Sequence, residues 1–362
     1  MRPARALGVG GDPWGVSSVA VGPIAVGIAG LGRSGWNIHA AALEQHEGYR
    51  VVAVADPLPE RQNEARTRFG CAVYGEPEAM LADPHVELVV VATPSHTHAP
   101  LATRALEAGR QVVVEKPMAQ DVAELDAAIA AARRGGRILT CYQPYRFNAN
   151  FRAVQEAIAG GRLGRVVLIK HTQNNFIRRA DWQMLRRLGG GELSNNGPHI
   201  LDQALLLLGE GPVEVCADLQ HTIGGGDAED HVKLLLKANG IVVDIELSHC
   251  CALPQPEWMV FGTSGALCSV QGGFRLRWFD PTGLPEPVVD EGAAAGRRYQ
   301  RPEELPWKED EVHPVQERST ALCFYDGLRA TLRDGAPVEV TPESVRRQIE
   351  IIERARRLAG LP

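Results

Sequence analysis

The chain has 362 residues, and at roughly 100–200 residues per domain this length predicts two domains. Hydrophobic residues make up 44% and charged residues 23%, with 38 Gly and 24 Pro, a composition that excludes wholesale disorder. The net charge of −6 argues against a general nucleic-acid binder, which carries a basic surface. No run approaches the roughly 18 apolar residues of a membrane span. We therefore expect neither nucleic acid nor a membrane as a partner.

The seven cysteines bear on the compartment and on metal binding. Their number is odd and no two stand in CxxC spacing, so neither a disulfide framework nor a structural zinc site is expected. Free thiols in apolar contexts act as small hydrophobic groups, and we expect a reducing, cytoplasmic location. His96 and His98 lack a third neighbour with ligand spacing, so no metal is predicted. Residues 1–22 contain no continuous apolar segment, which predicts a flexible leader rather than a signal peptide.

From Pro23 onward, short apolar runs alternate with helical patterns. Strands are predicted at 24–29, 50–55, 86–92, 111–114 and 137–142, and helices at 34–43, 60–69, 98–108 and 121–134. Nearly continuous Val, Ile and Leu in strands that helices separate indicate a parallel sheet covered on both faces. These elements predict a first domain over residues 23–145.

After Tyr142 the pattern changes to strands grouped in pairs. Strands are predicted at 165–172, 231–237, 241–249, 258–261, 266–270 and 274–279, and helices at 151–159 and 201–208. Asn239-Gly240 favours a hairpin with a type I′ turn, and residues 281–310 are expected to be irregular. Thr341 and Pro342 are typical of a helix start and predict a closing helix. The pairs predict an open, mainly antiparallel or mixed sheet over residues 146–362.

A glycine motif between the first strand and the first helix predicts a dinucleotide site. The motif is Gly30-Leu31-Gly32-Arg33-Ser34-Gly35. In a GxGxxG motif the first glycine permits a tight turn, the second lets the backbone approach a pyrophosphate and the third lets helix and strand pack closely. The helix amides then face the phosphates. A structural turn without a ligand is the alternative.

Asp56 follows the second strand, where a carboxylate accepts hydrogen bonds from the ribose hydroxyls of the cofactor. It would repel a 2′-phosphate, so NAD is favoured over NADP. Arg61 lies nearby in the sequence and could offset this repulsion.

Three stretches together resemble the Gfo/Idh/MocA oxidoreductases, the glucose-fructose oxidoreductase and inositol dehydrogenase family. They are VGIAGLGRSGW with VVAVADP, then VVVATPSHTHAP with VVVEKP, and finally GGGELSNNGPHILD. The resemblance implies an α/β protein with an N-terminal Rossmann domain and a C-terminal α/β domain that binds substrate and makes oligomer contacts. It also implies NAD(P)-dependent oxidation of a CH–OH group on a sugar, glycoside or cyclitol, by a homodimer or homotetramer.

The resemblance assigns roles to individual residues. Those expected beside the cofactor, in addition to the glycine motif and Asp56, are Thr93, Pro94, Ser95, His98, Glu115, Lys116 and Gln143. Those expected to act in catalysis are Lys116, His199, Asn195 and Asp202. Apart from the resemblance, Arg146, Asp181 and Trp182 are candidates for substrate binding; Asp181 and Trp182 fall between a strand and the Gly189–Gly191 turn, and a role as loop or interface residues is the alternative. Two positions depart from the commoner pattern, because Asn195 replaces an aspartate and Tyr145 replaces an arginine.

Oxidising a secondary alcohol requires a base for the hydroxyl proton, and His199 suits this because imidazole titrates near neutral pH. Lys116 can stabilise the developing alkoxide. Asn195 can orient His199 but carries no charge, which leaves three outcomes. His199 remains the base with help from Asp202, or Lys116 takes over, or catalysis is weak. We favour His199 assisted by Lys116.

Two other functions fit the same residues. One is a glycosidase that uses tightly bound NAD for transient oxidation, as some relatives of this family do. The other is a regulator that senses NAD and has lost the chemistry. The presence of both Lys116 and His199 argues against the regulator, and Asn195 argues for it.

Overall fold

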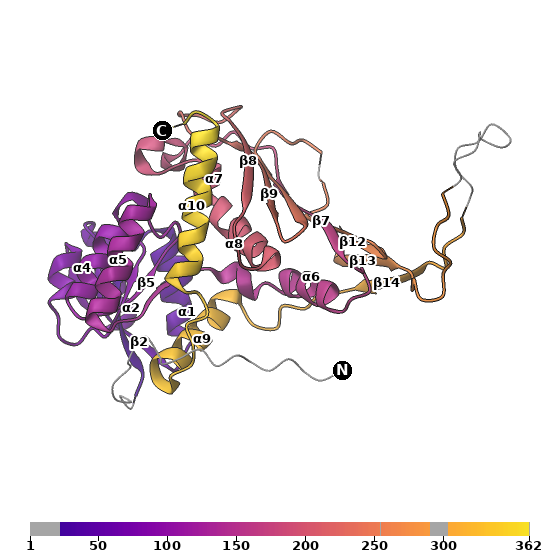
Figure 1. Cartoon of the computed structure of the whole chain (residues 1–362). Helices are drawn as coiled ribbons and strands as arrows, with labels where there is room; N and C mark the ends of the chain where they lie inside the picture. The colour runs from indigo at the N-terminus through magenta and orange to yellow at the C-terminus, as the bar shows by residue number, and fades with distance from the viewer. Residues whose placement is uncertain (1–21, 254, 290–302, 362) are drawn as a thin grey trace.

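The computed structural model of the protein describes residues 22–253, 255–289 and 303–361. The predicted leader therefore lies outside the described residues, apart from Gly22. The described chain forms two sheets, one six-stranded in the order β3-β2-β1-β4-β5-β6 and one eight-stranded in the order β14-β13-β12-β11-β7-β10-β9-β8 (Figure 1). Parallel and mixed sheets with packed helices confirm the predicted α/β class. No helix of the described part of the chain is long and apolar enough to cross a membrane.

The first sheet is parallel throughout. Its strands are β1 (Ile24–Ala29), β2 (Tyr49–Ala55), β3 (Ala72–Tyr74), β4 (Leu88–Val91), β5 (Gln111–Val114) and β6 (Leu139–Cys141). Five of the six were predicted, and β3 is the short strand that was not. The helices are η1 (Gly35–Ala40, a π-helical turn), α1 (Ala41–Glu44), α2 (Pro59–Phe69), α3 (Pro77–Leu81), η2 (Ser95–Thr97), α4 (His98–Glu107) and α5 (Val122–Gly135).

The second sheet is antiparallel except where β7 runs parallel to β10. Its strands are β7 (Val166–Asn174), β8 (Glu214–Gln220), β9 (His231–Ala238), β10 (Ile241–Ser248), β11 (Trp258–Gly262), β12 (Gly265–Val270), β13 (Gly273–Trp278) and β14 (Lys308–Val312). Asn239 and Gly240 have φ values of 51° and 76°, as the predicted type I′ turn requires. The expectation of an irregular segment up to residue 310 is wrong at its end, because β14 pairs there with β13.

Helices cover one face of this second sheet. The helices that follow β6 are η3 (Pro144–Phe147), α6 (Ala149–Ala159), η4 (Trp182–Met184), η5 (Arg186–Leu188), α7 (Glu192–Asn195), α8 (Gly197–Leu208), α9 (Thr320–Asp334) and α10 (Pro342–Leu358), and of these α6, α8 and α10 pack on the sheet. Apolar side chains of α6, α8 and α10 pack with the inward residues of the strands in one core. Thr341 caps α10 as predicted, its side chain accepting from the Ser344 amide.

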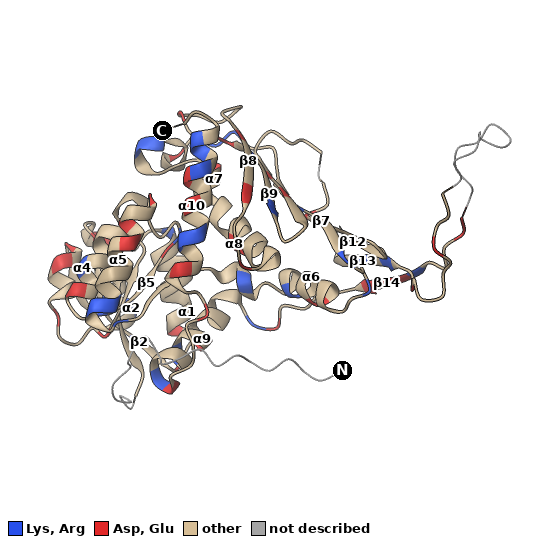
Figure 2. Cartoon of the chain, in the orientation of Figure 1, with Lys and Arg blue, Asp and Glu red and all other residues tan. Residues whose placement is uncertain are grey.

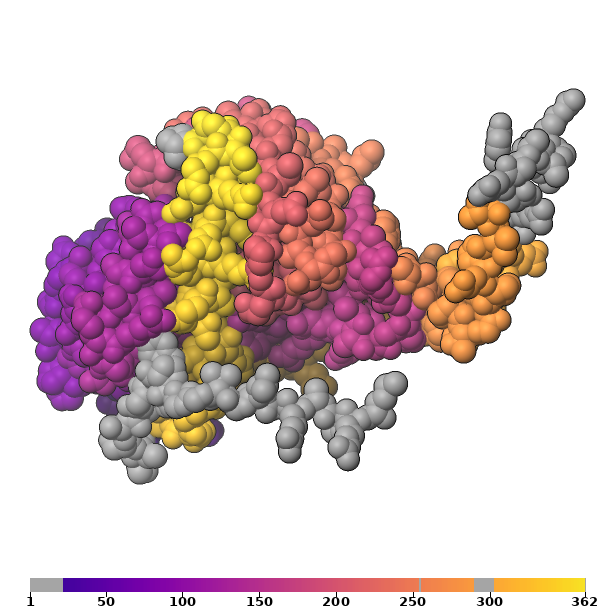
Figure 3. Space-filling model, in the orientation of Figure 1, coloured from indigo at the N-terminus to yellow at the C-terminus, as the bar shows by residue number. Residues whose placement is uncertain are grey.

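The last two helices reach back to the first sheet. Phe324, Tyr325, Leu328 and Leu332 of α9 belong to the buried core of the N-terminal domain. Helix α10 lies between the two halves of the molecule, as Figure 3 shows, and contributes apolar side chains to both cores. Its outward face carries interspersed acidic and basic residues (Figure 2). The N-terminal core is thus completed by chain from beyond residue 320.

Candidate active site

The glycine motif has the geometry of a dinucleotide loop. Gly30 has a φ of 90°, and a side chain there would meet the backbone oxygen of Ala92 at 2.6 Å. A Cβ on Gly35 would come within 1.8 Å of the Gly30 oxygen, so the helix can pack on the strand only without it. A Cβ on Gly32 would meet nothing within 4 Å, because this glycine faces an open cleft. The space that a pyrophosphate would fill is therefore present.

Asp56 anchors the same loop. One carboxylate oxygen accepts from the Leu31 amide at 2.8 Å, and the other accepts from the Leu58 amide at 3.0 Å. Arg61 lies 3.3 Å from this carboxylate. The side chain of Asp56 is almost fully buried, whereas that of Arg61 is 41% exposed. The acid thus lies at the bottom of the cleft, with the arginine at its edge.

Two cavities meet at Lys116. The cofactor cleft, about 760 Å³, runs past Gly32, Asp56 and the Thr93–Ser95 loop. The catalytic cavity, about 650 Å³, is lined by His199, Tyr145 and residues of α1 and α9. The residues that line both are Arg33, Ser34, Glu115, Lys116, Arg179 and Gln183. A cofactor in the cleft and a substrate in the cavity would touch beside Lys116.

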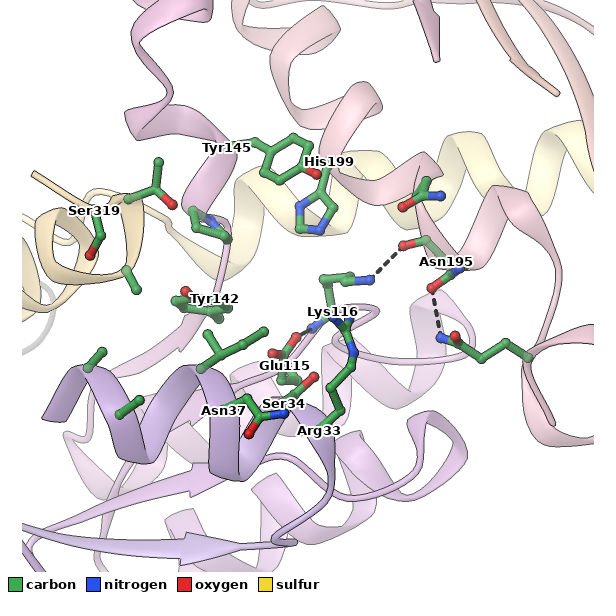
Figure 4. Close-up of a pocket in the computed structure, with 18 of the residues that line it drawn as sticks. Arg33, Ser34, Asn37, Glu115, Lys116, Tyr142, Tyr145, Asn195, His199 and Ser319 are labelled. Carbon is green, nitrogen blue, oxygen red and sulfur yellow. Dashed lines mark hydrogen bonds between the residues drawn. The ribbon is translucent and has the colours of Figure 1, made fainter. Parts of the chain in front are cut away.

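Lys116 follows β5 at the carboxyl edge of the first sheet. Its Nζ donates to the backbone oxygen of Asn195 at 2.7 Å (Figure 4). Burial lowers the pKa of Lys116 below its ordinary value, and the Glu115 carboxylate opposes this effect. The ammonium has one fixed protein acceptor here and two further protons to offer to a ligand.

Glu115 lines both cavities and also belongs to a buried hydrogen-bond network behind them. Its carboxylate lies 3.2 Å from Nε2 of His39, and Nδ1 of His39 lies 2.6 Å from the hydroxyl of Tyr325 in α9. Burial would raise the pKa of Glu115, but the hydrogen bond and charge of His39 outweigh it and lower this pKa to about 2. Glu115 also accepts from the Lys116 amide at 3.0 Å. The strand end that carries Lys116 is thereby attached to η1 and α9.

His199 lies in α8 with its ring between Tyr145 and Lys116 (Figure 4). The Tyr145 ring stacks on it with centroids 4.1 Å apart and planes 14° apart. Nδ1 of His199 lies 3.1 Å from Oε1 of Gln143. Burial lowers the pKa of His199 well below its ordinary value, Lys116 lowers it further, and Glu115 opposes both. His199 is therefore a neutral imidazole at neutral pH, which is the form that accepts a proton.

The structure corrects the partners expected for His199. The Asn195 side chain turns away and accepts from Nε2 of Gln183 at 2.7 Å, so it does not orient the imidazole. The residue at Nδ1 is Gln143, which was expected beside the cofactor. Asp202 does not contact His199 either, because Arg146 and Gln348 hold its carboxylate.

The prediction that Arg146 binds substrate is corrected by the same ion pair. Its Nε and Nη2 donate to the two oxygens of Asp202, each at 2.6 Å, and both side chains are largely buried. Arg146 also donates to the Glu339 oxygen and to Ser344. The guanidinium donors are therefore used within the protein, and Arg146 lines neither cavity.

The other predicted residues lie along the cofactor cleft. Thr93, Pro94 and Ser95 form one wall, and Asp181 and Trp182 line the cleft rather than the catalytic cavity. The ring of His98 lies between two carbonyl oxygens, with Nδ1 2.7 Å from that of Pro117 and Nε2 2.8 Å from that of Thr93. His98 thus connects the two loops that flank the cleft.

Several lining residues were not predicted. They are Asn37, Tyr142, Asn196, Ser319 and Thr320 in the catalytic cavity, and His39 and Tyr325 behind Glu115. Ser319 and Thr320 come from the start of α9, which no motif connects to the site. Asn37 and His39 had a local signal, because they lie on the helix that the glycine motif opens, and Asn196 lies within the GGGELSNNGPHILD stretch.

Comparison with known proteins identifies the family. A profile described as the oxidoreductase family with an NAD-binding Rossmann fold matches residues 24–143, and one for the GFO/IDH/MocA C-terminal domain matches residues 151–268. The chain belongs to the Gfo/Idh/MocA family of oxidoreductases. As a member of this family it is an NAD(P)-binding oxidoreductase, which confirms the resemblance seen in the sequence.

Characterised Gfo/Idh/MocA relatives include inositol dehydrogenases. The chain is 26% identical to scyllo-inositol 2-dehydrogenase (NADP(+)) IolW of Bacillus subtilis over 92% of this chain and 93% of that protein. It is 27% identical to myo-inositol 2-dehydrogenase of Thermotoga maritima over 67% of this chain and 74% of that one. Among solved structures, GenD2 from gentamicin A biosynthesis in complex with NAD is 26% identical, with a TM-score of 0.75 over 95% of this chain and 96% of that chain.

Proposed function

We propose that this oxidoreductase is an NAD-dependent dehydrogenase that oxidises a secondary hydroxyl of a sugar, glycoside or cyclitol. The observation that best supports this proposal is the position of Lys116, which lines both the cofactor cleft and the catalytic cavity. The cavity lining is rich in amides and hydroxyls, which suit a polyol. Its lining residues that bear such groups are Ser34, Asn37, Gln45, Tyr142, Tyr145, Gln183, Asn195, Asn196, Ser319 and Thr320.

The proposed chemistry divides between two side chains. When bound, the nicotinamide supplies the hydride acceptor. Lys116 donates to the substrate oxygen and stabilises the negative charge that develops on it. His199 accepts the hydroxyl proton on the ring nitrogen that does not face Gln143. The Asn195 backbone oxygen positions Lys116, and the Tyr145 ring restricts the plane of the imidazole.

The preference for NAD rests on Asp56. Its buried carboxylate lies where ribose hydroxyls would bind, and a 2′-phosphate would bring two negative charges against it. Arg61 lies beside Asp56 and weakens this repulsion without replacing the acid. The name of the relative IolW specifies NADP(+), so the proposal concerns this chain alone. It predicts a lower dissociation constant for NAD than for NADP.

One experiment tests the proposed function. The dissociation constants of NAD and NADP are measured first, and the protein with the tighter cofactor is then given a panel of sugars, inositols and aryl glycosides while nicotinamide absorbance is followed. Accumulation of NADH with one hydroxyl substrate supports the proposal. Release of the aryl group without net NADH would instead show the glycosidase. Tight NAD binding with no turnover on any substrate would favour the regulator.

We also propose a homodimer or homotetramer that associates through the open face of the eight-stranded sheet. Side chains alternate along these strands, and the face opposite the helices carries half-exposed Val167 and Leu235. The molecular mass in solution, measured by light scattering, tests this proposal. A cytoplasmic location is proposed on the seven free thiols, since reducing compartments keep thiols unpaired.

A further inference from the structure

A chain of buried polar side chains leads from His199 to an ion pair behind the catalytic cavity. Gln143 Oε1 faces Nδ1 of His199 at 3.1 Å, and Gln143 Nε2 donates to Oε1 of Gln348 at 3.0 Å. Gln348 Nε2 in turn donates to Oδ1 of Asp202 at 2.5 Å. All four side chains are buried, so water does not replace these partners. They come from the end of β6, from α8 and from α10.

The Asp202–Arg146 ion pair at the far end determines which group donates in each of these hydrogen bonds. Both oxygens of Asp202 accept from Arg146, so this carboxylate is ionised and only accepts hydrogen bonds. The end of the Gln348 amide that faces Asp202 must then be its NH₂ group. Its oxygen consequently faces Gln143, whose own NH₂ must point toward it.

The orientation of the two amides therefore determines which nitrogen of the His199 ring carries a proton. The end of the Gln143 amide left for His199 is the oxygen, which can only accept, so Nδ1 must carry a proton. In a neutral imidazole the other nitrogen, Nε2, is then unprotonated. Among the described residues no protein group hydrogen-bonds Nε2, which leaves it free for a substrate in the catalytic cavity.

We propose that the relay Asp202–Gln348–Gln143 sets the tautomer of His199 and so makes Nε2 the proton-accepting atom of the site. Gln348 and Asp202 are positioning residues in this proposal, because they act on His199 only through Gln143. The relay does the work that a carboxylate beside the imidazole would do, without placing a charge there. It rests on the proposed function only in naming the proton that Nε2 accepts; the tautomer itself is a property of the resting protein.

The tautomer can be measured without a substrate. Full-length protein labelled with ¹⁵N-histidine is examined at neutral pH by long-range ¹H–¹⁵N correlation, and His199→Asn identifies the His199 signals. Protonated and unprotonated ring nitrogens resonate in separate regions. We expect the Nδ1–H form in the native protein. The Nε2–H form would overturn the proposal at once, whatever the activity of the enzyme.

Variants then test the relay itself. Gln348→Met keeps the side-chain volume but leaves the NH₂ group of Gln143 only its longer contact with the Pro198 oxygen, at 3.4 Å, so the amide rotates more easily and the Nε2–H population should rise several-fold. On a confirmed substrate, kcat should fall by about 10–100-fold, as for other supporting hydrogen bonds at active sites, with KM nearly unchanged. Gln203→Met is the matched control. It removes the buried side-chain amide of Gln203 in α8, which donates to the Tyr145 backbone oxygen, and it should leave the His199 tautomer unchanged.

A rescue separates the relay from a merely structural role. Gln143→Glu in the Gln348→Met background places a carboxylate at Nδ1, and both of its oxygens accept, so no relay is needed to orient it. This double variant should regain the Nδ1–H form. An unchanged tautomer in Gln348→Met, or a double variant that stays in the Nε2–H form, would overturn the proposal. Absence of turnover with the expected tautomers would contradict the proposed function alone.

Discussion

His199 illustrates how surroundings decide what a residue can do. Burial and Lys116 lower its pKa, so the neutral form that accepts a proton persists to lower pH than for a free imidazole. Activity that depends on neutral His199 is lost only when the pH falls through this lowered pKa. We therefore expect the acidic limb of the kcat/KM profile to lie below 6.5, the ordinary value.

The role of His199 as proton acceptor can be tested by substitution. His199→Ala should lower turnover by about 10²–10⁴-fold, the usual contribution of a base, while the dissociation constant of NAD stays nearly constant. Steady-state kinetics and cofactor titration check both parts. Near-full activity in this variant would show that another group takes the proton, with Lys116 the first candidate.

Glu115 and His39 make a prediction about acid stability. The pKa of Glu115 is about 2 in the folded protein, against an ordinary 4.5. Its contribution to the free energy of unfolding is therefore complete above pH 4.5 and is lost as the pH falls toward 2. His39→Phe leaves a buried carboxylate without its partner and should destabilise the protein by about 3–5 kcal/mol.

Urea unfolding at several pH values measures this effect. The matched control is Glu44→Gln, which breaks an exposed pair with Arg68 and should cost at most about 1 kcal/mol. An equal loss in the two variants would mean that the His39–Glu115 contact contributes no more than a surface ion pair.

The sequence predicted the site residues whose roles depend on local chain. Gly32, Asp56 and Lys116 follow strands of one parallel sheet, and the ends of such strands meet at one edge. The partners of His199 could not be predicted in this way. Gln348, which orients Gln143 at the imidazole, lies on a helix near residue 350, and Gln183, which holds the Asn195 side chain away, lies in η4. The polar group that faces an imidazole is selected by packing between segments that lie far apart in the sequence, and no local motif reports that packing.

At the scale of elements, the glycine loop gives a pair of contrasting substitutions. Gly32→Val should fold normally, because its side chain enters open space, but should abolish NAD binding by filling the pyrophosphate site. Gly35→Val should destabilise the protein itself, because its Cβ would overlap the Gly30 backbone. Thermal unfolding and NAD titration distinguish the two. Native NAD affinity in folded Gly32→Val would mean that the loop serves only as a turn.

Elements with strong apolar runs were predicted and weakly patterned ones were not. The central strands of the first sheet are nearly continuous Val, Ile and Leu because helices cover both faces. Strand β3 has only three residues, and β14 is mostly charged and lies at a sheet edge. Helix α9 had signals at both ends, with Ser319 as its cap and Gly335 at a positive φ, but its amphipathic pattern went unpredicted.

At the scale of the whole molecule, α9 connects the two halves. It supplies Phe324 and Tyr325 to the N-terminal core and begins beside Ser319 at the catalytic cavity. A fragment of residues 22–150 should therefore lack a cooperative thermal transition, although it contains the entire first sheet. Linking residues 319–350 to this fragment should restore one. A sharp transition in the shorter fragment would show that α9 is dispensable for the core.

The completion of the first core by the last helices also bears on synthesis of the chain. Phe147 and Phe324 share one buried cluster, yet roughly 180 residues separate them, which at about 5–20 residues per second take on the order of 10–40 s to translate. Throughout that interval the N-terminal sheet is present without the helix that covers part of it. The nascent chain therefore exposes apolar surface until α9 has been synthesised, and folding of the first core is tied to α9 rather than to emergence of the first sheet.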